Sequence, residues 1–222
     1  MSVAENIAAV RSTIPEGVEL VAVSKFHPVE ALQEAYDAGQ RVFGESRIQE
    51  LLVKIPALPD DIKWHFIGHL QTNKVRKLVE TGRIALIESI DSERLLDIVD
   101  RDSAAAGVTS RVLLQVHVAQ EETKFGFLPE ELLDYFRRRA FENLKATHIC
   151  GIMGMASNTD DTERIKADFA RIAAVRKEIS EMCPDLRGFD ILSMGMSHDY
   201  PLAIGEGATH VRIGTAIFGE RQ

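Results

Sequence analysis

The stretch His210-Val211-Arg212-Ile213-Gly214-Thr215 decides the fold that we predict for this chain. It reads as a short apolar strand that runs directly into glycine and threonine. An upstream stretch, Ser193-Met194-Gly195-Met196-Ser197, repeats this pattern after another apolar run. Glycine leaves backbone N–H groups uncovered and serine or threonine adds a hydroxyl, so both stretches are typical of a phosphate site. Near the start of the chain, Val21-Ala22-Val23-Ser24-Lys25 ends an apolar strand on a lysine.

Outward from these stretches, strand-length apolar runs alternate with helical patterns along the whole chain. The pattern predicts strands at 18–24, 41–43, 63–67, 84–88, 111–118, 146–153, 189–192 and 209–213. It predicts helices at 3–13, 29–38, 48–55, 73–80, 91–107, 129–142, 160–182 and 199–206. We therefore expect residues 1–222 to form one α/β domain, a single (β/α)8 TIM barrel with an additional N-terminal helix. The alternative is an open doubly wound sheet, but no Gly-x-Gly-x-x-Gly follows the first strand.

Composition and charge narrow the class of protein. The formal net charge of −8 argues against a general nucleic-acid binder. No apolar run reaches the roughly 18 residues of a transmembrane helix, and residues 1–11 lack the pattern of a signal peptide, so we expect no membrane association. The two cysteines, Cys150 and Cys183, form no Cys-x-x-Cys pair and are expected to be reduced thiols of a cytoplasmic protein.

Closure of the barrel would bring the two ends of the sequence together. The first strand would lie beside the eighth, and the eighth beside the seventh, about 4.8 Å apart. Lys25, Ser193 and Arg212 would then share one arc of the C-terminal rim, where barrel active sites lie. We expect them to hold the two ends of one small phosphorylated aldehyde, because a desolvated lysine amine can attack an aldehyde to form a Schiff base. For Lys25, the alternative is a solvated strand end.

Arg212 is predicted to share one face of the last strand with other functional candidates. Strand alternation puts His210, Arg212 and Gly214 on that face. An arginine within a strand is costly unless it is paired, so it either forms an internal ion pair with Glu45 or Glu88 or contacts a ligand. We favour the ligand, because glycine and threonine follow at once.

Three further motifs have simple structural interpretations beside the functional ones. Ser197 precedes a predicted helix and is typical of an N-cap. Met153-Gly154-Met155 and Met194-Gly195-Met196 are predicted to fill the core, with apolar walls beside a flat ring as the alternative. His65 and His69 have the spacing of metal ligands on a helix, but here they span a strand end and a loop, and we predict no metal site.

Five stretches carry a resemblance to a known family. They are VAVSK at 21–25, FGESRIQE at 43–50, WHFIGHLQTNK at 64–74, SMGMS at 193–197 and VRIGTAIFG at 211–219. Together they make the chain resemble, from end to end, the YggS/PROSC family of pyridoxal 5′-phosphate-binding proteins, which is related to the barrel domain of bacterial alanine racemases.

The resemblance implies a cofactor, pyridoxal 5′-phosphate, and the residues that bind it. Lys25 matches the lysine that holds the cofactor as a Schiff base, and Arg212 matches the arginine that faces the pyridine nitrogen. The family usually has asparagine where this chain has Ser46, so that a contact to the ring becomes water-mediated or is lost. The remaining residues expected at the cofactor are the phosphate cradle of Ser193, Gly214 and Thr215, with Met194 and Gly195 beside it.

The resemblance further implies a non-catalytic protein that takes part in vitamin B6 and amino-acid homeostasis. A protonated Arg212 does not favour a protonated pyridine nitrogen, which makes the ring a poor electron sink. Racemases of this fold add a catalytic tyrosine from a second domain on a partner chain. We expect this chain, which ends at Gln222, to lack that domain and to be a monomer. Apo-enzymes that use pyridoxal phosphate are candidate recipients of the cofactor.

Two other functions remain open from the residues alone. The first is a pyridoxal-phosphate-dependent, racemase-like enzyme with weak activity, whose second acid or base would be one of His65, His69 and Tyr200. The second is a Schiff-base barrel that acts on a sugar phosphate without a cofactor. We rank it last.

Overall fold

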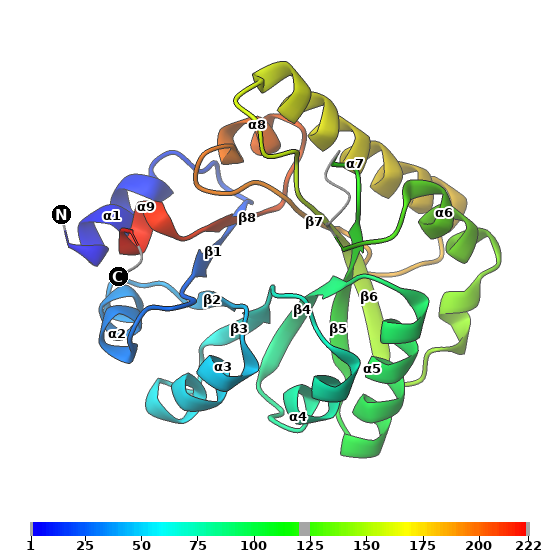
Figure 1. Cartoon of the computed structure of the whole chain (residues 1–222), viewed down its shortest axis with the longest axis horizontal. Helices are drawn as coiled ribbons and strands as arrows, with labels where there is room; N and C mark the ends of the chain where they lie inside the picture. Colours follow the sequence, from blue (N-terminus) through cyan, green and yellow to red (C-terminus); the bar gives the residue numbers. More distant parts are fainter. Residues whose placement is uncertain (1, 120–124, 221–222) are drawn as a thin grey trace.

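Eight parallel strands close into a barrel in the computed structural model of the chain, which describes residues 2–119 and 125–220 (Figure 1). Each strand pairs with the next one along the chain, and the last pairs with the first, with Val21 opposite Arg212. This closure confirms the predicted (β/α)8 barrel and excludes the open doubly wound sheet. The strands are β1 (Glu19–Val23), β2 (Val42–Glu45), β3 (Lys63–Phe66), β4 (Ile84–Ile90), β5 (Ser110–Val116), β6 (Thr147–Gly154), β7 (Ile191–Ser193) and β8 (His210–Ile213).

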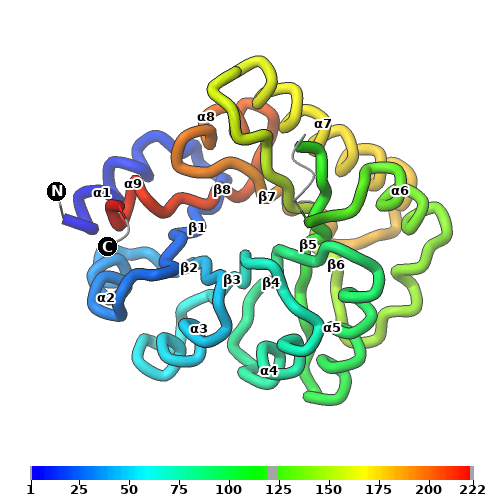
Figure 2. The backbone as a smooth tube through the Cα atoms, in the orientation of Figure 1, coloured from blue at the N-terminus to red at the C-terminus, as the bar shows by residue number. Residues whose placement is uncertain are grey.

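The first and last helices lie side by side, next to the junction of β1 and β8 (Figure 2). The first, α1 (Val3–Arg11), is the predicted N-terminal helix. It begins at a capping box, in which the Ser2 hydroxyl accepts the Glu5 N–H at 3.2 Å and the Glu5 carboxylate accepts the Ser2 N–H at 2.8 Å. The Asn6 side chain donates to the Ile217 carbonyl at 2.8 Å and ties α1 to α9 (Thr215–Phe218).

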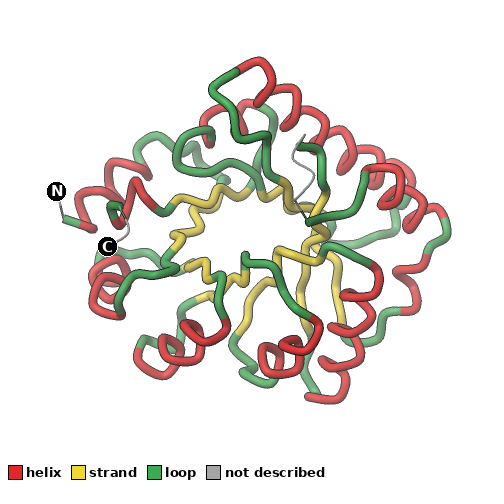
Figure 3. The backbone as a smooth tube through the Cα atoms, in the orientation of Figure 1, coloured by secondary structure: helices red, strands yellow, loops and turns green. Residues whose placement is uncertain are grey.

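The other helices pack around the outside of the strands, which form the inner ring (Figure 3). They are α2 (Val29–Asp37), α3 (Ile48–Lys54), α4 (Val75–Val79), α5 (Glu93–Ala106), α6 (Pro129–Arg137), α7 (Thr162–Met182) and α8 (Tyr200–Gly205), with 3-10 turns η1 (Ile55–Ala57), η2 (Thr72–Lys74) and η3 (Ala140–Asn143). Across residues 2–119 and 125–220, no helix combines the length and apolarity that crossing a membrane requires.

Apolar side chains fill both faces of the strands. Neighbours such as Leu113 and Leu114 belong to different buried clusters, because side chains alternate along a strand. The larger cluster lies between strands and helices and includes the fully buried Trp64 and Phe136. This two-sided burial explains why the strands read as continuous apolar runs. The smaller cluster, on the inner faces, comprises Leu86, Leu113, Cys150, Met153 and Ile191.

Several elements differ from the sequence prediction for local reasons. The helix predicted at 129–142 is broken into α6 and η3, because Arg139 adopts a left-handed conformation with φ of 52°. The helix predicted at 73–80 opens as η2 and becomes α-helical only at Val75. Strand β7 begins at Ile191, two residues after the predicted start at 189. Helix α9 was not predicted, because four residues are too short to show helical periodicity.

Candidate functional site

A cavity of about 230 Å³ lies at the C-terminal ends of β1, β2 and β8, on the rim that the sequence predicts. It brings together five of the predicted site residues, namely Lys25, Ser46, Arg212, Gly214 and Thr215. No carboxylate is among the residues that line it, so its charge favours an anionic ligand. The other lining residues are Val23, Ile67, Met155, Met196, Ser197 and His198.

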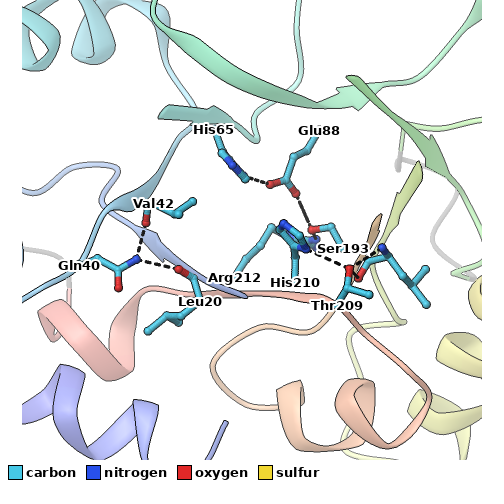
Figure 4. Close-up of polar contacts among 10 residues, drawn as sticks. Leu20, Gln40, Val42, His65, Glu88, Ser193, Thr209, His210 and Arg212 are labelled. Atoms are coloured by element: carbon cyan, nitrogen blue, oxygen red, sulfur yellow. Dashed lines mark hydrogen bonds and ion pairs between the residues drawn. The ribbon is translucent and has the colours of Figure 1, made fainter. Parts of the chain in front are cut away.

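Arg212 extends from β8 into the barrel beneath this cavity and is 5% exposed (Figure 4). Its guanidinium donates from Nη1 to the Ser193 hydroxyl at 2.6 Å and from Nη2 to the Gly154 carbonyl at 3.0 Å. The Glu88 carboxylate lies 3.7 Å from Nη1. Burial lowers the pKa of Arg212, opposed by the charge of Glu88. An arginine nevertheless stays protonated in proteins, so this group presents a fixed positive charge to the cavity.

Glu88 is the centre of the polar cluster inside the barrel (Figure 4). Its two oxygens bond the His65 ring Nδ1 and the Ser193 hydroxyl, each at 2.6 Å. Burial alone would raise the pKa of Glu88, but the hydrogen bond and charge of His65, the charge of Arg212 and the Ser193 hydroxyl lower it to about 2. Burial also lowers the pKa of the neighbouring His210 to about 4. The internal ion pair considered for Arg212 is therefore present, and its partner is Glu88.

The sequence matches known proteins along its whole length. The family model described as alanine racemase, N-terminal domain, matches residues 1–222. A pyridoxal phosphate homeostasis protein of Schizosaccharomyces pombe is 41% identical over 207 residues, which cover 92% of this chain and 84% of the relative. Its counterpart in Aquifex aeolicus is 40% identical over 209 residues, covering 92% and 87%. The chain belongs to the pyridoxal phosphate homeostasis protein family.

Several solved structures superpose on this chain. PipY of Synechococcus elongatus without pyridoxal phosphate superposes with a TM-score of 0.92 at 40% identity, covering 98% of this chain and 100% of PipY. PipY with pyridoxal phosphate bound gives a TM-score of 0.89 at 39% identity, with the same coverage. Alanine racemase of Clostridium difficile, at 14% identity, a TM-score of 0.78 and 56% of its own length covered, shares the fold alone.

Three residues that the family resemblance placed at the cofactor do not line the cavity. Ser193 and Met194 are fully buried, and the Ser193 hydroxyl is engaged by both Arg212 and Glu88. Gly195 adopts a φ of 92°, and a Cβ built on it would lie 2.6 Å from the Ala203 Cβ. Ser193 therefore accepts a hydrogen bond from Arg212 inside the barrel. Gly195 forms a tight turn that packs against α8.

Ser197 lines the cavity; it belongs to the stretch 193–197 that is typical of a phosphate site, and a helix N-cap was its structural alternative. Its hydroxyl accepts the Gly214 N–H at 3.3 Å, from the loop that follows β8. The prediction that Ser197 caps the next helix is wrong, because Asp199 occupies the N-cap of α8 and accepts the Met196 N–H at 2.5 Å. The position of Ser197 in the sequence could have indicated this role. Ser193 ends β7 and is buried, whereas Ser197 lies four residues beyond it and reaches the rim.

Ser46, where the resemblance implies that relatives carry asparagine, lines the cavity from the loop after β2. The loop after β3 packs tightly on it, because a Cβ on Gly68 would lie 2.3 Å from the Ser46 carbonyl oxygen. A close backbone approach of this kind is open only to glycine. Gly68 thus fixes the backbone of Ser46, and the short side chain of Ser46 leaves room in the cavity.

The histidines considered as metal ligands have separate carboxylate partners. His65 bonds Glu88 inside the barrel, whereas His69 lies 3.1 Å from Asp91 on the rim and stacks on Phe125. In the described part of the chain, no three His, Cys, Asp or Glu side chains gather as a metal site would require. Two larger cavities, of about 440 and 390 Å³, lie beside α3 and beside η3, and no residue of β8 lines either of them.

Proposed function

We propose that this chain binds pyridoxal 5′-phosphate, with its phosphate held near Ser197, Gly214 and Thr215 and its aldehyde carbon joined to the Lys25 amine as a Schiff base. The observation that carries the proposal is the composition of the cavity at the β1–β8 junction, where a lysine, an arginine and two serines meet without a carboxylate. Membership of the pyridoxal phosphate homeostasis family supports it, as does the bound cofactor in PipY.

The residues of the cavity fit this cofactor. A Cβ on Gly214 would lie 3.2 Å from the Val23 carbonyl oxygen, so glycine lets the turn after β8 lie close to β1 and Lys25. The first intrahelical bond of α9 runs from Ile217 to Gly214, which leaves the N–H groups of Thr215 and Ala216 ahead of it. When bound, the cofactor supplies an aldehyde that amines attack and a ring that withdraws electrons. Arg212 would hold the side of the ring that carries the nitrogen.

We propose that the role is cofactor homeostasis without turnover, in residues 1–222 acting as one domain. Besides Lys25 and Arg212, His198 is the one titratable side chain that lines the cavity. It is more than half exposed and lies 3.4 Å from Asp199, so it is not shielded from water. A monomer that passes the cofactor to apo-enzymes in the cytoplasm completes the proposal; both cysteines are free thiols, which suits that compartment.

The first test is an absorbance titration with pyridoxal 5′-phosphate. The wild-type protein is expected to show a Schiff-base band at about 420 nm, and borohydride reduction followed by peptide mapping should place the adduct on Lys25. Lys25→Ala should lose the band. Lys63→Ala is the matched control, because Lys63 is exposed at the start of β3, at the opposite end of the barrel. A wild-type protein without the band would refute cofactor binding.

Turnover and hand-over need separate assays. We expect no racemisation and no solvent-deuterium exchange at Cα with a panel of amino acids; robust exchange that is lost in both Lys25→Ala and His198→Ala would favour the racemase-like alternative. Transfer of cofactor to an apo-enzyme should be faster than spontaneous release from the holo-protein. Light scattering of the loaded protein tests the monomer.

A further inference from the structure

Helix α3 holds the backbone on both sides of Lys25. The Lys54 ammonium donates to the Ser24 carbonyl at 2.9 Å, which belongs to the peptide group before Lys25. The Glu50 carboxylate accepts the Phe26 N–H at 2.7 Å, which belongs to the peptide group after Lys25. Two charged side chains, one turn apart on one helix, therefore fix both peptide planes that meet at the Lys25 Cα.

These charged groups are joined in one buried network. Besides the Ser24 carbonyl, the Lys54 ammonium contacts Glu45 at 2.7 Å and Glu50 at 3.2 Å, so its three N–H groups have three partners. Glu45 also accepts the Ser24 hydroxyl at 2.6 Å. Lys54 is 4% exposed and Glu45 is completely buried. Burial raises the pKa of Glu45, opposed by the charge of Lys54, as expected for a carboxylate that is costly to desolvate.

The residue after Lys25 is strained. Phe26 has a φ of 69°, a left-handed conformation that a bulky side chain rarely adopts. The Arg47 guanidinium, from the residue before α3, lies 4.5 Å from the centre of the Phe26 ring. Such strain persists where the surroundings over-determine it, and it concentrates at functional sites. Here two contacts hold Phe26 in this conformation: Glu50 accepts its N–H, and the Arg47 guanidinium lies over its ring.

We propose that Glu50 and Lys54 are positioning residues that hold residues 24–26 in the strained turn and so direct the Lys25 amine into the cavity; this rests on the cofactor site proposed above. Stability alone does not account for the network, because a buried ion pair is often no more stable than apolar residues of the same volume. A fixed lysine, in contrast, forms a Schiff base without first ordering its backbone, so that the network contributes to affinity.

The test compares variants in the titration with pyridoxal 5′-phosphate, followed through the Schiff-base band. Glu50→Ala removes the acceptor of the Phe26 N–H and is expected to weaken the apparent affinity about tenfold, since hydrogen bonds to charged groups are the strong ones. Glu50→Gln keeps an oxygen acceptor and should recover part of this loss. Asp100→Ala is the matched control, because Asp100 also accepts backbone N–H groups, those of Lys145 and Ala146, but far from the cavity.

A double-mutant cycle separates positioning from general destabilisation. Glycine adopts a positive φ without strain, so Glu50→Ala should cost clearly less affinity in a Phe26→Gly background than alone. A purely structural role of Glu50 predicts equal costs in both backgrounds. Lys54→Met removes the donor to the Ser24 carbonyl and should also weaken binding. Melting temperatures of all variants are measured alongside, and if Lys54→Met does not fold, the Glu50 and Phe26 variants decide.

The outcomes distinguish the two proposals. A wild-type protein without the band overturns both the cofactor site and the positioning role. A wild-type protein that binds, with Glu50→Ala binding equally well, leaves the cofactor site intact and overturns the positioning role. The same conclusion follows if Asp100→Ala weakens binding as much as Glu50→Ala at an equal loss of melting temperature.

Discussion

Replacing Glu88 with glutamine removes one negative charge from the interior of the barrel and changes its shape little. The substitution leaves the buried Arg212 guanidinium without its counter-ion, and breaking a buried pair in this way costs about 3–5 kcal/mol. The pKa gives a second measure: lowering it from 4.5 to about 2 corresponds to roughly 3 kcal/mol, at about 1.4 kcal/mol per pH unit. We therefore expect Glu88→Gln to lower the free energy of unfolding at pH 7 by about 3 kcal/mol.

The pH dependence of this loss is the decisive part of the prediction. Because the pKa of Glu88 is lower in the folded chain than in the unfolded one, its stabilisation is complete above about pH 4.5 and is lost as the pH falls toward 2. The difference in free energy of unfolding between wild type and Glu88→Gln should shrink over the same window. Guanidinium titrations followed by circular dichroism at several pH values between 7 and 2.5 measure it.

The control for this experiment is Glu80→Gln. Glu80 forms an exposed ion pair with Arg76 on the surface of α4, so its loss should change stability by no more than about 1 kcal/mol. A Glu88→Gln difference that stays constant between pH 7 and 3, or that does not exceed the control, would refute the reasoning, because the negative charge of Glu88 would then not stabilise the barrel.

Three further predictions concern the rim and the barrel. Ser197→Ala should reduce the preference for pyridoxal 5′-phosphate over pyridoxal in binding titrations, whereas Ser193→Ala should leave that preference intact and lower the melting temperature. Burial lowers the pKa of His210 to about 4, so the unfolded chain takes up the proton first and stability falls as the pH drops from about 6.5 toward 4; His210→Asn should flatten the unfolding profile in that window. Gly195→Ala combines a positive φ with a 2.6 Å approach to Ala203 and should cost about 1–3 kcal/mol in chemical denaturation.

The sequence predicted the barrel because its strands are covered on both faces. Continuous apolar runs followed by helical patterns leave few arrangements besides a parallel sheet with helices outside it. The sequence also indicated that the sheet closes, because Lys25 and Arg212 can contact one ligand only if the first and last strands are neighbours. The pairing of Val21 with Arg212 confirms this expectation.

The interior of the site was less accessible to sequence reasoning. Strand alternation placed Arg212 and His210 on the inner face, but not the depth at which each lies. Ser193 and Ser197 have the same chemistry in the same short stretch, and only the point where β7 ends separates a buried serine from one at the rim. The pairing of Lys54 with the Ser24 carbonyl could not be predicted, because it depends on how α3 packs against the β1–α2 loop.

The junction between β1 and β8 also determines when the site comes into existence. Lys25 follows β1, the first strand of the barrel to be synthesised, whereas Arg212 lies in the last, β8, and Gly214 and Thr215 come directly after it. Contacts between such distant parts of a chain form late and slowly during folding. Every nascent chain that still lacks β8 therefore carries Lys25 without the β8 residues that share its cavity in the finished barrel. A ligand that bridges both ends binds only the finished barrel, and by mass action it favours the closed form over chains whose last strand has detached.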